Sequence, residues 1–488
     1  MAAEPEQMEQ HLKTEYQTDL DKLFYPESIA IFGVSKTSNN LGGASYMRKL
    51  LESGYAGRIY PINPRGGTIY GRPVFKNLPA LPETPDFAIV CVAAKLVPGI
   101  LEDCAAAGLS HIHILSAGFS ELGNREGVEI EAQVTALSKR TGLKVVGPNC
   151  MGTYCPAAHL TAWGEMPGFS GPIGIISQSG GITQRLTEYI SSLGIGVAKA
   201  VSIGNAAVLT AHDYLAYMAE DSQIEVIALY LESIKDGPGL LKLVRRIGRK
   251  KPIVLLKGRD SEAGATTVVS HTGSMAGRPA IWRAFSRQTG AVQVGSLNEW
   301  VDAMMAFSLL PRPNGKGVFI IGGGGGNSVT YSDICVRQHL SVPGLSDESM
   351  QKLRQLVPAV GSIAGNPLDL FSVFQNASVL SELLSLACDD PAVDMMIIDR
   401  LIPRRIYHLP DLPDSTPDVI RAIRNRDCRK PVVVTLDSDG GDDALSKQGT
   451  QIRRRFCVSG IPAYPSIGRA AKALACFHQY HEWKSKSG

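Results

Sequence analysis

Short apolar runs alternate with amphipathic stretches along most of this chain. Runs of about four to eight apolar residues between turn residues are typical of strands buried on both faces of a parallel sheet. The pattern predicts strands at residues 28–33, 58–63, 87–92, 111–115, 144–147, 171–177, 225–232, 252–257, 317–322, 394–399 and 431–436. It predicts helices at 43–53, 182–193, 279–288 and 467–477. This alternation is the pattern of an α/β fold with doubly wound parallel sheets.

Three blocks of this kind follow one another, and a length of 488 residues is too great for one ordinary core. We expect an N-terminal extension at 1–23, a first α/β domain at 24–155, and two further α/β domains of similar layout at 170–310 and 317–488. The proline- and glycine-rich residues 311–317 are expected to be a linker.

Composition narrows the functional classes. A net charge of +3 gives no case for a nucleic-acid-binding surface, and the triplet 453–455 of arginines is expected to be one solvated helix face. No apolar run approaches the roughly 20 residues of a membrane-spanning helix, and residues 1–23 lack the apolar core of a secretory signal. The nine cysteines are scattered without zinc-ligand pairing, so we expect reduced thiols, no metal site and a cytoplasmic location.

The loop after the first strand, residues 33–43, is rich in glycine and places backbone N–H groups where a phosphate could bind. It is not the G-x-G-x-x-G fingerprint of a dinucleotide-binding protein. The second strand ends in Asn63 and Pro64, where such a protein would have an acidic residue for the ribose. A nicotinamide cofactor is therefore not expected, whereas another phosphate-bearing ligand stays open, with Lys36 and Arg65 to supply charge.

A second candidate site follows the strand at 171–177. Ser179, Gly180 and Gly181 open the next helix, so hydroxyl and N–H groups meet the positive end of the helix dipole, as an anion site requires. An ordinary helix cap is the alternative. The sequence lacks the first glycine of G-x-S-x-G and has no evident triad partners, which argues against a hydrolase.

Two further side chains could act beside this anion site. Glu232 ends the apolar run at 226–231, and the carboxyl ends of strands are where α/β folds place ligands. His271 lies among small residues in the loop that follows the strand at 252–257. A solvent-facing strand end and a core or capping histidine are the alternatives. Together, a histidine, a carboxylate and an anion pocket are the parts needed to carry a phosphoryl group on imidazole.

Several segments, taken in order, make the chain resemble the α subunit of NDP-forming acyl-CoA synthetases, relatives of succinyl-CoA synthetase. The resemblance runs from about residue 23 to 481. It is carried by the segments at 59–64, 116–121, 147–152, 177–181, 270–273 and 365–369. The resemblance implies a Rossmann-like CoA-binding domain followed by two flavodoxin-like domains of the succinyl-CoA ligase type.

The resemblance also implies roles for individual residues. His271 would be the phosphorylated histidine, Glu232 its supporting carboxylate, and Ser179, Gly180 and Gly181 the phosphate site. Pro148 and Asn149 would border the acyl site. The remaining predicted residues would bind coenzyme A: Gly33, Ser35, Lys36, Asn63, Pro64, Arg65, Ser116, Ala117 and Gly118.

The nucleotide-binding half has no candidate segment. In fused relatives an ATP-grasp module shares the chain, and here the run Gly322–Gly326 is followed by Asn327 and Ser328, without the lysine of a P-loop. We therefore expect ATP and Mg²⁺ to bind a separate ATP-grasp β subunit, most simply in an α₂β₂ assembly.

The resulting hypothesis is an enzyme that joins a small carboxylic acid to CoA while ATP becomes ADP and phosphate, through an acyl phosphate and phospho-His271. A CoA-binding regulatory or scaffold protein is the alternative, although such a protein needs neither His271 nor Glu232. An acyl-CoA hydrolase or CoA transferase would need a base or an acyl-accepting carboxylate that the sequence does not place.

Overall fold

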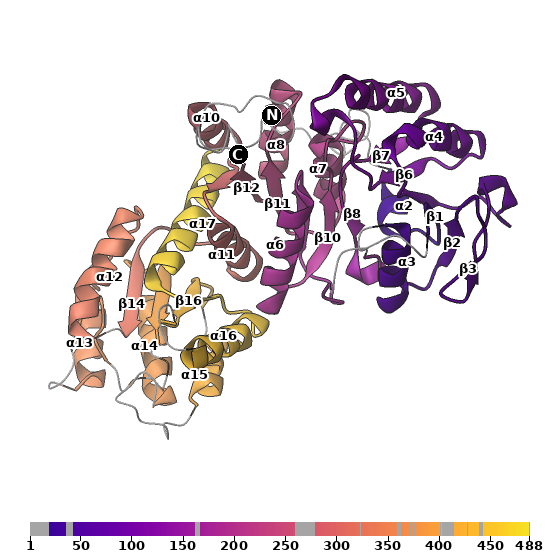
Figure 1. The fold of residues 1–488 in the computed structure, drawn as a ribbon. Helices are drawn as coiled ribbons and strands as arrows, with labels where there is room; N and C mark the ends of the chain where they lie inside the picture. The colour runs from indigo at the N-terminus through magenta and orange to yellow at the C-terminus, as the bar shows by residue number, and fades with distance from the viewer. Residues whose placement is uncertain are drawn as a thin grey trace. The chain divides into compact units, whose positions relative to one another are not determined.

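A computed structural model describes most of the chain (Figure 1). The described residues are 19–35, 42–161, 166–258, 279–322, 324–358, 363–370, 373, 376–400, 402, 414–426, 428–438 and 443–487. They form two compact units, each with its own core. Unit 1 comprises the described residues of Met1–Ser191 and Gly196–Gly295, and unit 2 comprises those of Ser192–Ile195 and Ser296–Ser487. None of the helices searched among these residues is both long and apolar enough to cross a membrane.

The first sheet of unit 1 is wholly parallel, in the order β2-β1-β5-β6-β7. Its strands are β1 (Ser28–Phe32), β2 (Arg58–Ile62), β5 (Phe87–Val90), β6 (His111–Ile114) and β7 (Lys144–Val146). The α-helices that connect them are α3 (Gly43–Glu52), α4 (Val97–Ala106) and α5 (Arg125–Thr141), and a short hairpin pairs β3 (Thr68–Ile69) with β4 (Arg72–Pro73). All five strands overlap the runs predicted from the sequence, because a strand covered on both faces has to be continuously apolar.

The second sheet of unit 1 has the order β13-β12-β11-β9-β10-β8. Its parallel strands are β9 (Ile173–Ser177), β10 (Val197–Ser202), β11 (Val226–Leu231), β12 (Ile253–Lys257) and β13 (Val292–Val294). Read from β10 to β13, this is the flavodoxin-like order, in which the first strand lies between the second and the third. The edge strand β8 (Gly152–Tyr154) pairs antiparallel with β10, although it falls within the predicted first domain at 24–155.

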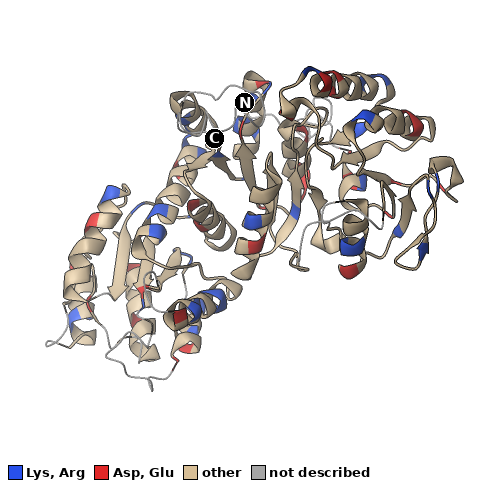
Figure 2. Ribbon diagram, viewed as in Figure 1, with Lys and Arg blue, Asp and Glu red and all other residues tan. Residues whose placement is uncertain are grey.

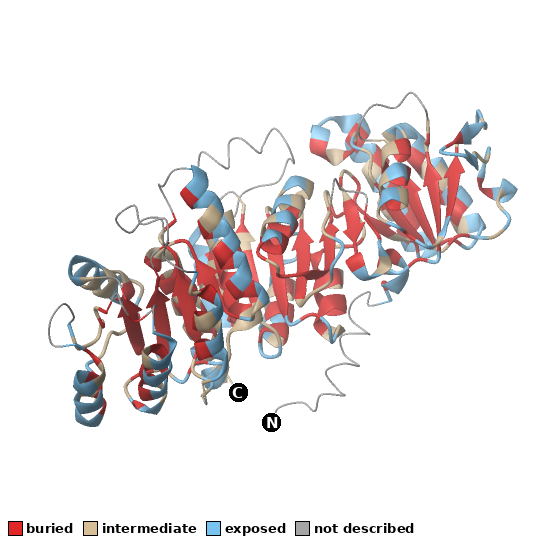
Figure 3. Cartoon of the chain, turned by 90° about the horizontal axis from the view of Figure 1, so that it is seen from below, coloured by how far each residue is buried: buried red, intermediate tan, exposed pale blue. Residues whose placement is uncertain are grey.

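Helices cover both sheets of unit 1, and their starts follow from the sequence. The helices of the second sheet are α6 (Gly180–Ser192), α7 (Ala211–Glu220), α8 (Gly237–Gly248) and α10 (Pro279–Thr289), and α2 (Asp21–Phe24) precedes the first sheet. Thr210 and Asp213 form a capping box at the start of α7, and Asp236 accepts from the backbone N–H of Gly239 at the start of α8. Figure 3 shows the resulting layers, with buried strands inside and exposed helix faces outside.

Unit 2 contains a four-stranded parallel sheet in the order β14-β15-β16-β17. Its strands are β14 (Val318–Gly322), β15 (Met395–Asp399), β16 (Val432–Thr435) and β17 (Ala463–Tyr464). Its helices are α11 (Leu297–Leu309), α12 (Gly325–Arg337), α13 (Asp347–Leu356), α14 (Ala377–Asp389), α15 (Thr416–Arg424), α16 (Asp443–Val458) and α17 (Ile467–Ser487). In the glycine run, Gly322 ends β14 and α12 begins at Gly325, whereas Gly323 lies outside the described residues.

Two expectations from composition are wrong. Cys388 and Cys428 form a disulfide, because packing in unit 2 brings their Cα atoms to 5.9 Å across a sequence separation of 40. The arginine triplet is not one solvated face, since Arg453 lies on the inner side of α16 and is only 8% exposed. Elsewhere the helices carry acidic and basic residues side by side (Figure 2), as a net charge of +3 suggests.

Candidate active site

The predicted CoA-binding residues lie at the carboxyl end of the first sheet. Gly33 follows β1 with φ +81°, and its N–H donates to the carbonyl of Ile62 over 3.0 Å. A Cβ at Gly33 would overlap the carbonyl oxygen of Cys91, so glycine is required where the chain turns away from the strand. Ser35 is the last described residue of this loop, and Lys36 lies outside the described residues.

Asn63 ties the end of β2 to the same loop. Its side-chain nitrogen donates to the carbonyl of Val34 over 2.9 Å, and its side-chain oxygen accepts from the N–H of Arg65 over 3.0 Å. The amide is therefore engaged in holding the backbone. Pro64 and Arg65 are exposed beside it, where the guanidinium can reach an anionic ligand.

The ends of β5, β6 and β7 meet at Ser116. Its hydroxyl donates to the carbonyl of Val92, and its carbonyl accepts from the N–H of Asn149 over 2.9 Å. Gly118, at φ +111°, donates its N–H to the carboxylate of Glu121 over 2.6 Å. Ala117, between Ser116 and Gly118, is exposed. The structure thus brings the predicted CoA-binding residue Ser116 and the predicted acyl-site residue Asn149 together.

The segment with Pro148 and Asn149 also touches the second sheet. The N–H of Asn205, which follows β10, donates to the carbonyl of Pro148 over 3.0 Å, and the side chains of Asn149 and Asn205 lie 3.3 Å apart. A Cβ at Gly180 would overlap the side chain of Met151, so the start of α6 packs directly on this segment. The predicted CoA and acyl site at the first sheet and the predicted phosphate site at the start of α6 are therefore neighbours within unit 1. We call them the two half-sites.

The predicted phosphate site lies at the junction of β9 and α6. The hydroxyl of Ser179 accepts from the N–H of Ile182 at 3.4 Å, a long capping contact. Gly181 is exposed, and no described atom lies within 4 Å of the position of a Cβ there. The junction therefore has the glycine exposure and the helix N-terminus that a phosphate requires.

Glu232 lies next to this junction, because β11 pairs with β9. The side-chain oxygen of Gln178 accepts from the N–H of Glu232 over 2.5 Å and from the N–H of Ser233 over 3.0 Å. The hydroxyl of Tyr230 lies 3.2 Å from the Glu232 carboxylate, and Lys257 donates to the Glu232 carbonyl over 2.8 Å. The ends of β9, β11 and β12 are thus fixed around Glu232.

His271 lies at 259–278, outside the described residues. The described chain stops at Gly258, whose N–H donates to the carbonyl of Leu231 over 2.9 Å, directly before Glu232 in the sequence. The last described residue before the predicted histidine segment therefore lies beside the end of β11, next to Glu232. Among the described residues, no group of three or more His, Cys, Asp or Glu side chains could hold a metal ion.

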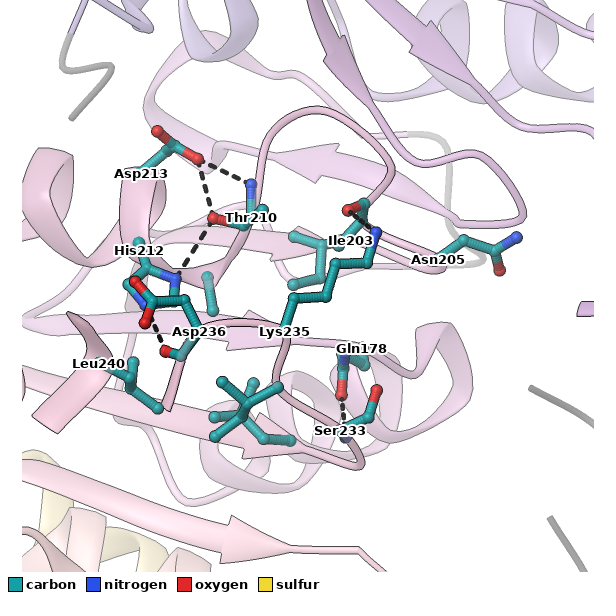
Figure 4. Close-up of a pocket in the computed structure, with 14 residues that line it drawn as sticks. Gln178, Ile203, Asn205, Thr210, His212, Asp213, Ser233, Lys235, Asp236 and Leu240 are labelled. Atoms are coloured by element: carbon teal, nitrogen blue, oxygen red, sulfur yellow. Dashed lines mark hydrogen bonds between the residues drawn. The ribbon is translucent and has the colours of Figure 1, made fainter. Parts of the chain in front are cut away.

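A cavity of about 240 Å³ opens at the carboxyl end of the second sheet, beside Gln178 and Ser233 (Figure 4). Asn205, His212 and Lys235 also line it, and none of these five residues was predicted from the sequence. All follow β9, β10 or β11, so the rule that ligands bind at the carboxyl ends of strands could have found them.

Comparison with known proteins gives the same organisation. Residues 27–156 match the family model of a CoA binding domain, residues 170–307 that of a succinyl-CoA ligase like flavodoxin domain, and residues 318–480 that of a ligase-CoA domain. Together with the parallel sheets, these matches confirm the predicted fold class.

Relatives match over almost the whole chain. The α subunit of acetate–CoA ligase [ADP-forming] I from Pyrococcus furiosus is 33% identical, over 96% of this chain and 99% of that protein. The 4-hydroxybutyrate–CoA ligase [ADP-forming] of Nitrosopumilus maritimus is 33% identical, over 95% of this chain and 64% of that longer protein. The dinucleotide-forming acetyl-coenzyme A synthetase 1 of Ca. Korarchaeum cryptofilum, solved in complex with phosphate and ADP, matches with 28% identity and a TM-score of 0.83, over 96% of this chain and 98% of that one. The chain therefore belongs to the family of ADP-forming acid–CoA ligases, among their α subunits.

Proposed function

We propose that this chain carries the CoA and phosphohistidine sites of its ligase and works with a separate nucleotide-binding subunit. The reaction of the family joins a carboxylic acid to CoA while ATP becomes ADP and phosphate. The observation that carries the proposal is the adjacency of the two half-sites, through Asn205 to the Pro148 segment and through Gly180 to Met151. A thioester at the first sheet and a phosphoryl group at α6 would then lie within reach of each other.

We assign CoA binding to residues 24–155 and ligase chemistry to 170–310 and 317–488. The loop at residues 33–43, which contains Gly33, Ser35 and Lys36, would hold the CoA phosphates. Arg65 would lie beside it. The Asn63 side chain donates to the Val34 carbonyl and so is engaged by the backbone. This arrangement suits a ligand that is bound through its phosphates better than one that is bound through a ribose hydroxyl. Ser116, Ala117 and Gly118 would face the reacting sulfur, with Pro148 and Asn149 at the acyl group.

The steps balance as three transfers. Phosphate attacks the thioester carbonyl, giving acyl phosphate and CoA; an imidazole nitrogen of His271 then takes the phosphoryl group and releases the carboxylate. ADP finally accepts the phosphoryl group from phospho-His271. The synthetic direction reverses these steps. Ser179, Gly180 and Gly181 would hold the phosphoryl oxygens with N–H groups, and Glu232 would balance the imidazolium charge.

The partner would supply the nucleotide site. Alpha-subunit relatives of this length imply a second subunit, and we propose that it is a β subunit with an ATP-grasp module that binds ATP and Mg²⁺. An α₂β₂ assembly in the cytoplasm is the simplest arrangement.

The histidine step can be tested on this chain alone, because acyl phosphate carries its own phosphoryl group. Radiolabelled acetyl phosphate should label the wild-type chain in an acid-labile, base-stable form, and His271→Ala should abolish the label. Glu232→Gln should slow labelling on the order of 10²-fold, because an amide cannot balance imidazolium charge. Glu225→Gln, at the exposed start of the same strand region, is the matched control. Labelling of a serine, with His271→Ala still labelled, would refute the mechanism.

The partner is tested separately. The pure chain should make no acyl-CoA from ATP, acid and CoA, and addition of the ATP-grasp subunit should restore synthesis. ATP-dependent synthesis by the chain alone, after a co-purified subunit is excluded, would contradict the division of labour.

A further inference from the structure

Glu121 anchors the loop at residues 116–118, which we call the thioester loop because we expect it near the reacting sulfur. One carboxylate oxygen of Glu121, Oε1, accepts from the N–H of Gly118 over 2.6 Å and from the N–H of Phe119 over 3.1 Å. Glu121 is only 9% exposed, so a low local dielectric strengthens these bonds. The carboxylate therefore fixes the backbone at the end of the thioester loop.

Other groups of the thioester loop are engaged with the protein as well. The hydroxyl of Ser116 donates to the carbonyl of Val92, and the carbonyl of Ser116 accepts from the N–H of Asn149 over 2.9 Å. The side chain of Phe119, directly after the loop, is fully buried in the core of the first sheet. Ala117 is exposed between these anchors, so the loop presents this residue to a ligand. A change in the carboxylate anchor would therefore move the exposed part of the loop.

The second oxygen of the Glu121 carboxylate extends this hold to the second sheet. It accepts from the side-chain nitrogen of Asn205, which follows β10, over 2.6 Å. The N–H of Asn205 in turn donates to the carbonyl of Pro148 over 3.0 Å. One chain of hydrogen bonds that begins at Glu121 thus holds both the thioester loop and the segment with the predicted acyl-site residues.

A neighbouring carboxylate shows what distinguishes Glu121. Glu131, on α5, accepts from the side-chain nitrogen of Asn205 over 2.8 Å and from the hydroxyl of Ser120 over 2.7 Å. Among the described residues, all side-chain hydrogen bonds of Glu131 end on one oxygen, Oε2. A glutamine could make the same bonds with its amide oxygen. At Glu121 both oxygens accept, so a glutamine there would turn an NH₂ group toward a donor.

We propose that Glu121 is a positioning residue for the thioester chemistry, acting through the N–H groups of Gly118 and Phe119 and through Asn205. The inference rests on the proposed function for the reaction itself. The step that Glu121 serves converts acyl phosphate and CoA into acyl-CoA and phosphate. The C–S bond forms, the C–O bond to phosphate breaks, and the released phosphate takes up the thiol proton. Glu121 keeps the exposed part of the thioester loop in place during this transfer.

Glu121→Gln tests this role, because it keeps the size of the side chain and removes one accepting oxygen. The full chain should form acetyl-CoA from acetyl phosphate and CoA. In Glu121→Gln the kcat of this transfer should fall about tenfold or more, since a displacement of about 1 Å at reacting groups can cost on the order of 10²-fold. The KM for CoA should stay within about twofold, because we expect CoA to be held mainly by its phosphates at residues 33–43. Glu131→Gln is the matched control and should keep both values within about threefold of wild type.

A second reaction of the same chain separates positioning from general damage. Labelling of His271 by radiolabelled acetyl phosphate needs no CoA, so Glu121→Gln should label within about threefold of the wild-type rate. Equal losses in acetyl-CoA formation and in labelling would mean that the substitution damages unit 1 as a whole, and would overturn the positioning role.

Hydrogen exchange resolved at the Gly118 and Phe119 amides tests the anchor itself. Exchange at both amides should speed up about tenfold in Glu121→Gln and stay near the wild-type rate in Glu131→Gln. Faster exchange in Glu121→Gln, when even the wild type forms no acetyl-CoA, would support the anchor and reject the proposed function. Unchanged exchange would overturn the proposal, whether or not the transfer slows.

Glu121→Asp is the second variant, should Glu121→Gln fail to fold. Its carboxylate keeps both oxygens and the charge but lies one carbon further from the two N–H groups. Faster exchange at Gly118 and Phe119 and slower acetyl-CoA formation are again expected. Wild-type exchange and a wild-type rate of transfer in Glu121→Asp would contradict the positioning role.

Discussion

The side-chain nitrogen of Asn205 donates to the carboxylate of Glu121 over 2.6 Å and to that of Glu131 over 2.8 Å. One amide from the loop after β10 thus joins two carboxylates from the segment after β6, and these elements belong to the two sheets of unit 1. Because the Asn205 backbone also holds the Pro148 carbonyl, the same residue positions the predicted acyl site.

Asn205→Ala should loosen this junction. The substitution removes the side-chain nitrogen that donates to the carboxylates of Glu121 and Glu131. Loss of a hydrogen bond to a charged group lowers the free energy of unfolding by about 2 kcal/mol. We expect the melting temperature of unit 1 to fall by roughly 4–8 °C, measured by calorimetry with hydrogen exchange to assign the transition. Asn314→Ala, at an exposed position between the helices and strands of unit 2, is the control. An unchanged melting temperature for Asn205→Ala would show that the junction contributes nothing.

A buried histidine makes the first sheet sensitive to acid. Burial lowers the pKa of His113 to about 4. The hydrogen bond to the carbonyl of Cys150 raises this pKa, but by less than burial lowers it. A histidine whose pKa is lowered on folding favours the folded state above its unfolded pKa of about 6.5, and this contribution is lost as the pH falls from there toward 4. Acidification from pH 7 to 5 should therefore cost about 2 kcal/mol at this site.

His113→Gln keeps a donor for the Cys150 carbonyl and removes the titration. Hydrogen exchange of the β6 amides at pH 7 and pH 5 measures the local free energy of opening, after correction for intrinsic exchange rates. The difference between the two pH values should shrink in His113→Gln. His481, whose pKa burial likewise lowers to about 4, is in unit 2, so His481→Gln should leave β6 unchanged. Equal acid sensitivity of wild type and His113→Gln would contradict the assignment.

In unit 2, α11 is fixed to α17 by a two-pronged ion pair. Arg469 donates from Nε and Nη2 to the two carboxylate oxygens of Asp302, over 2.6 and 2.7 Å, and the Asp302 side chain is only 4% exposed. Burial raises the pKa of Asp302, and the arginine opposes that rise. Removal of either partner leaves a buried charge, which typically costs about 3 kcal/mol or more.

A double-mutant cycle tests this pair. Asp302→Ala and Arg469→Ala should each destabilise unit 2, and the double variant should lose less than the sum of the two, with a coupling of about 1–3 kcal/mol. Lys486 and Glu482, an exposed pair on α17, should show little coupling in the same experiment. Strict additivity at Asp302 and Arg469 would mean that the two helices are held by apolar packing alone.

The sequence predicted the longer, continuously apolar strands, but it missed the short strands β8, β13 and β17 and also β10, where a charge interrupts the pattern. β10 was not predicted, because Lys199 stands in the middle of Val197–Ser202. In the structure that lysine is accommodated by an ion pair with Asp221 and by the ring of Tyr25, 4.8 Å from its nitrogen. Partners from distant parts of the chain thus make the charge tolerable, and a local pattern cannot show them.

The same limit applies to the candidate site. The positions of Glu232 and Ser179 at strand ends could be predicted, because each follows an evident apolar run, and their roles stay predictions. Asn205 and Lys235 could not be placed beside them, because their meeting depends on the order of β9, β10 and β11 in the sheet. Cys388 and Cys428 pair for the same reason, through packing in unit 2 rather than sequence spacing.

The close packing of Gly180 on Met151 makes a further prediction about the proposed phosphate site. Gly180→Ala should force Met151 and the segment before it to move, because the added carbon would overlap the Met151 side chain and the N–H of Met151 is held 3.3 Å from the hydroxyl of Ser202. A misplacement of about 1 Å at reacting groups can cost on the order of 10²-fold in rate. We expect labelling by acetyl phosphate to slow at least tenfold.

A second substitution separates this steric cause from a general effect of alanine at a helix start. Met151→Ala combined with Gly180→Ala removes the atoms that overlap, so the double variant should label faster than Gly180→Ala alone. Gly468→Ala, at the start of α17 where no described atom lies within 4 Å of the added carbon, should leave labelling unchanged and stabilise its helix by up to about 1 kcal/mol. If Met151→Ala fails to restore the rate while both variants remain folded, the slow labelling must come from the N–H groups of α6 themselves, and the packing of Met151 on Gly180 would have no part in the chemistry.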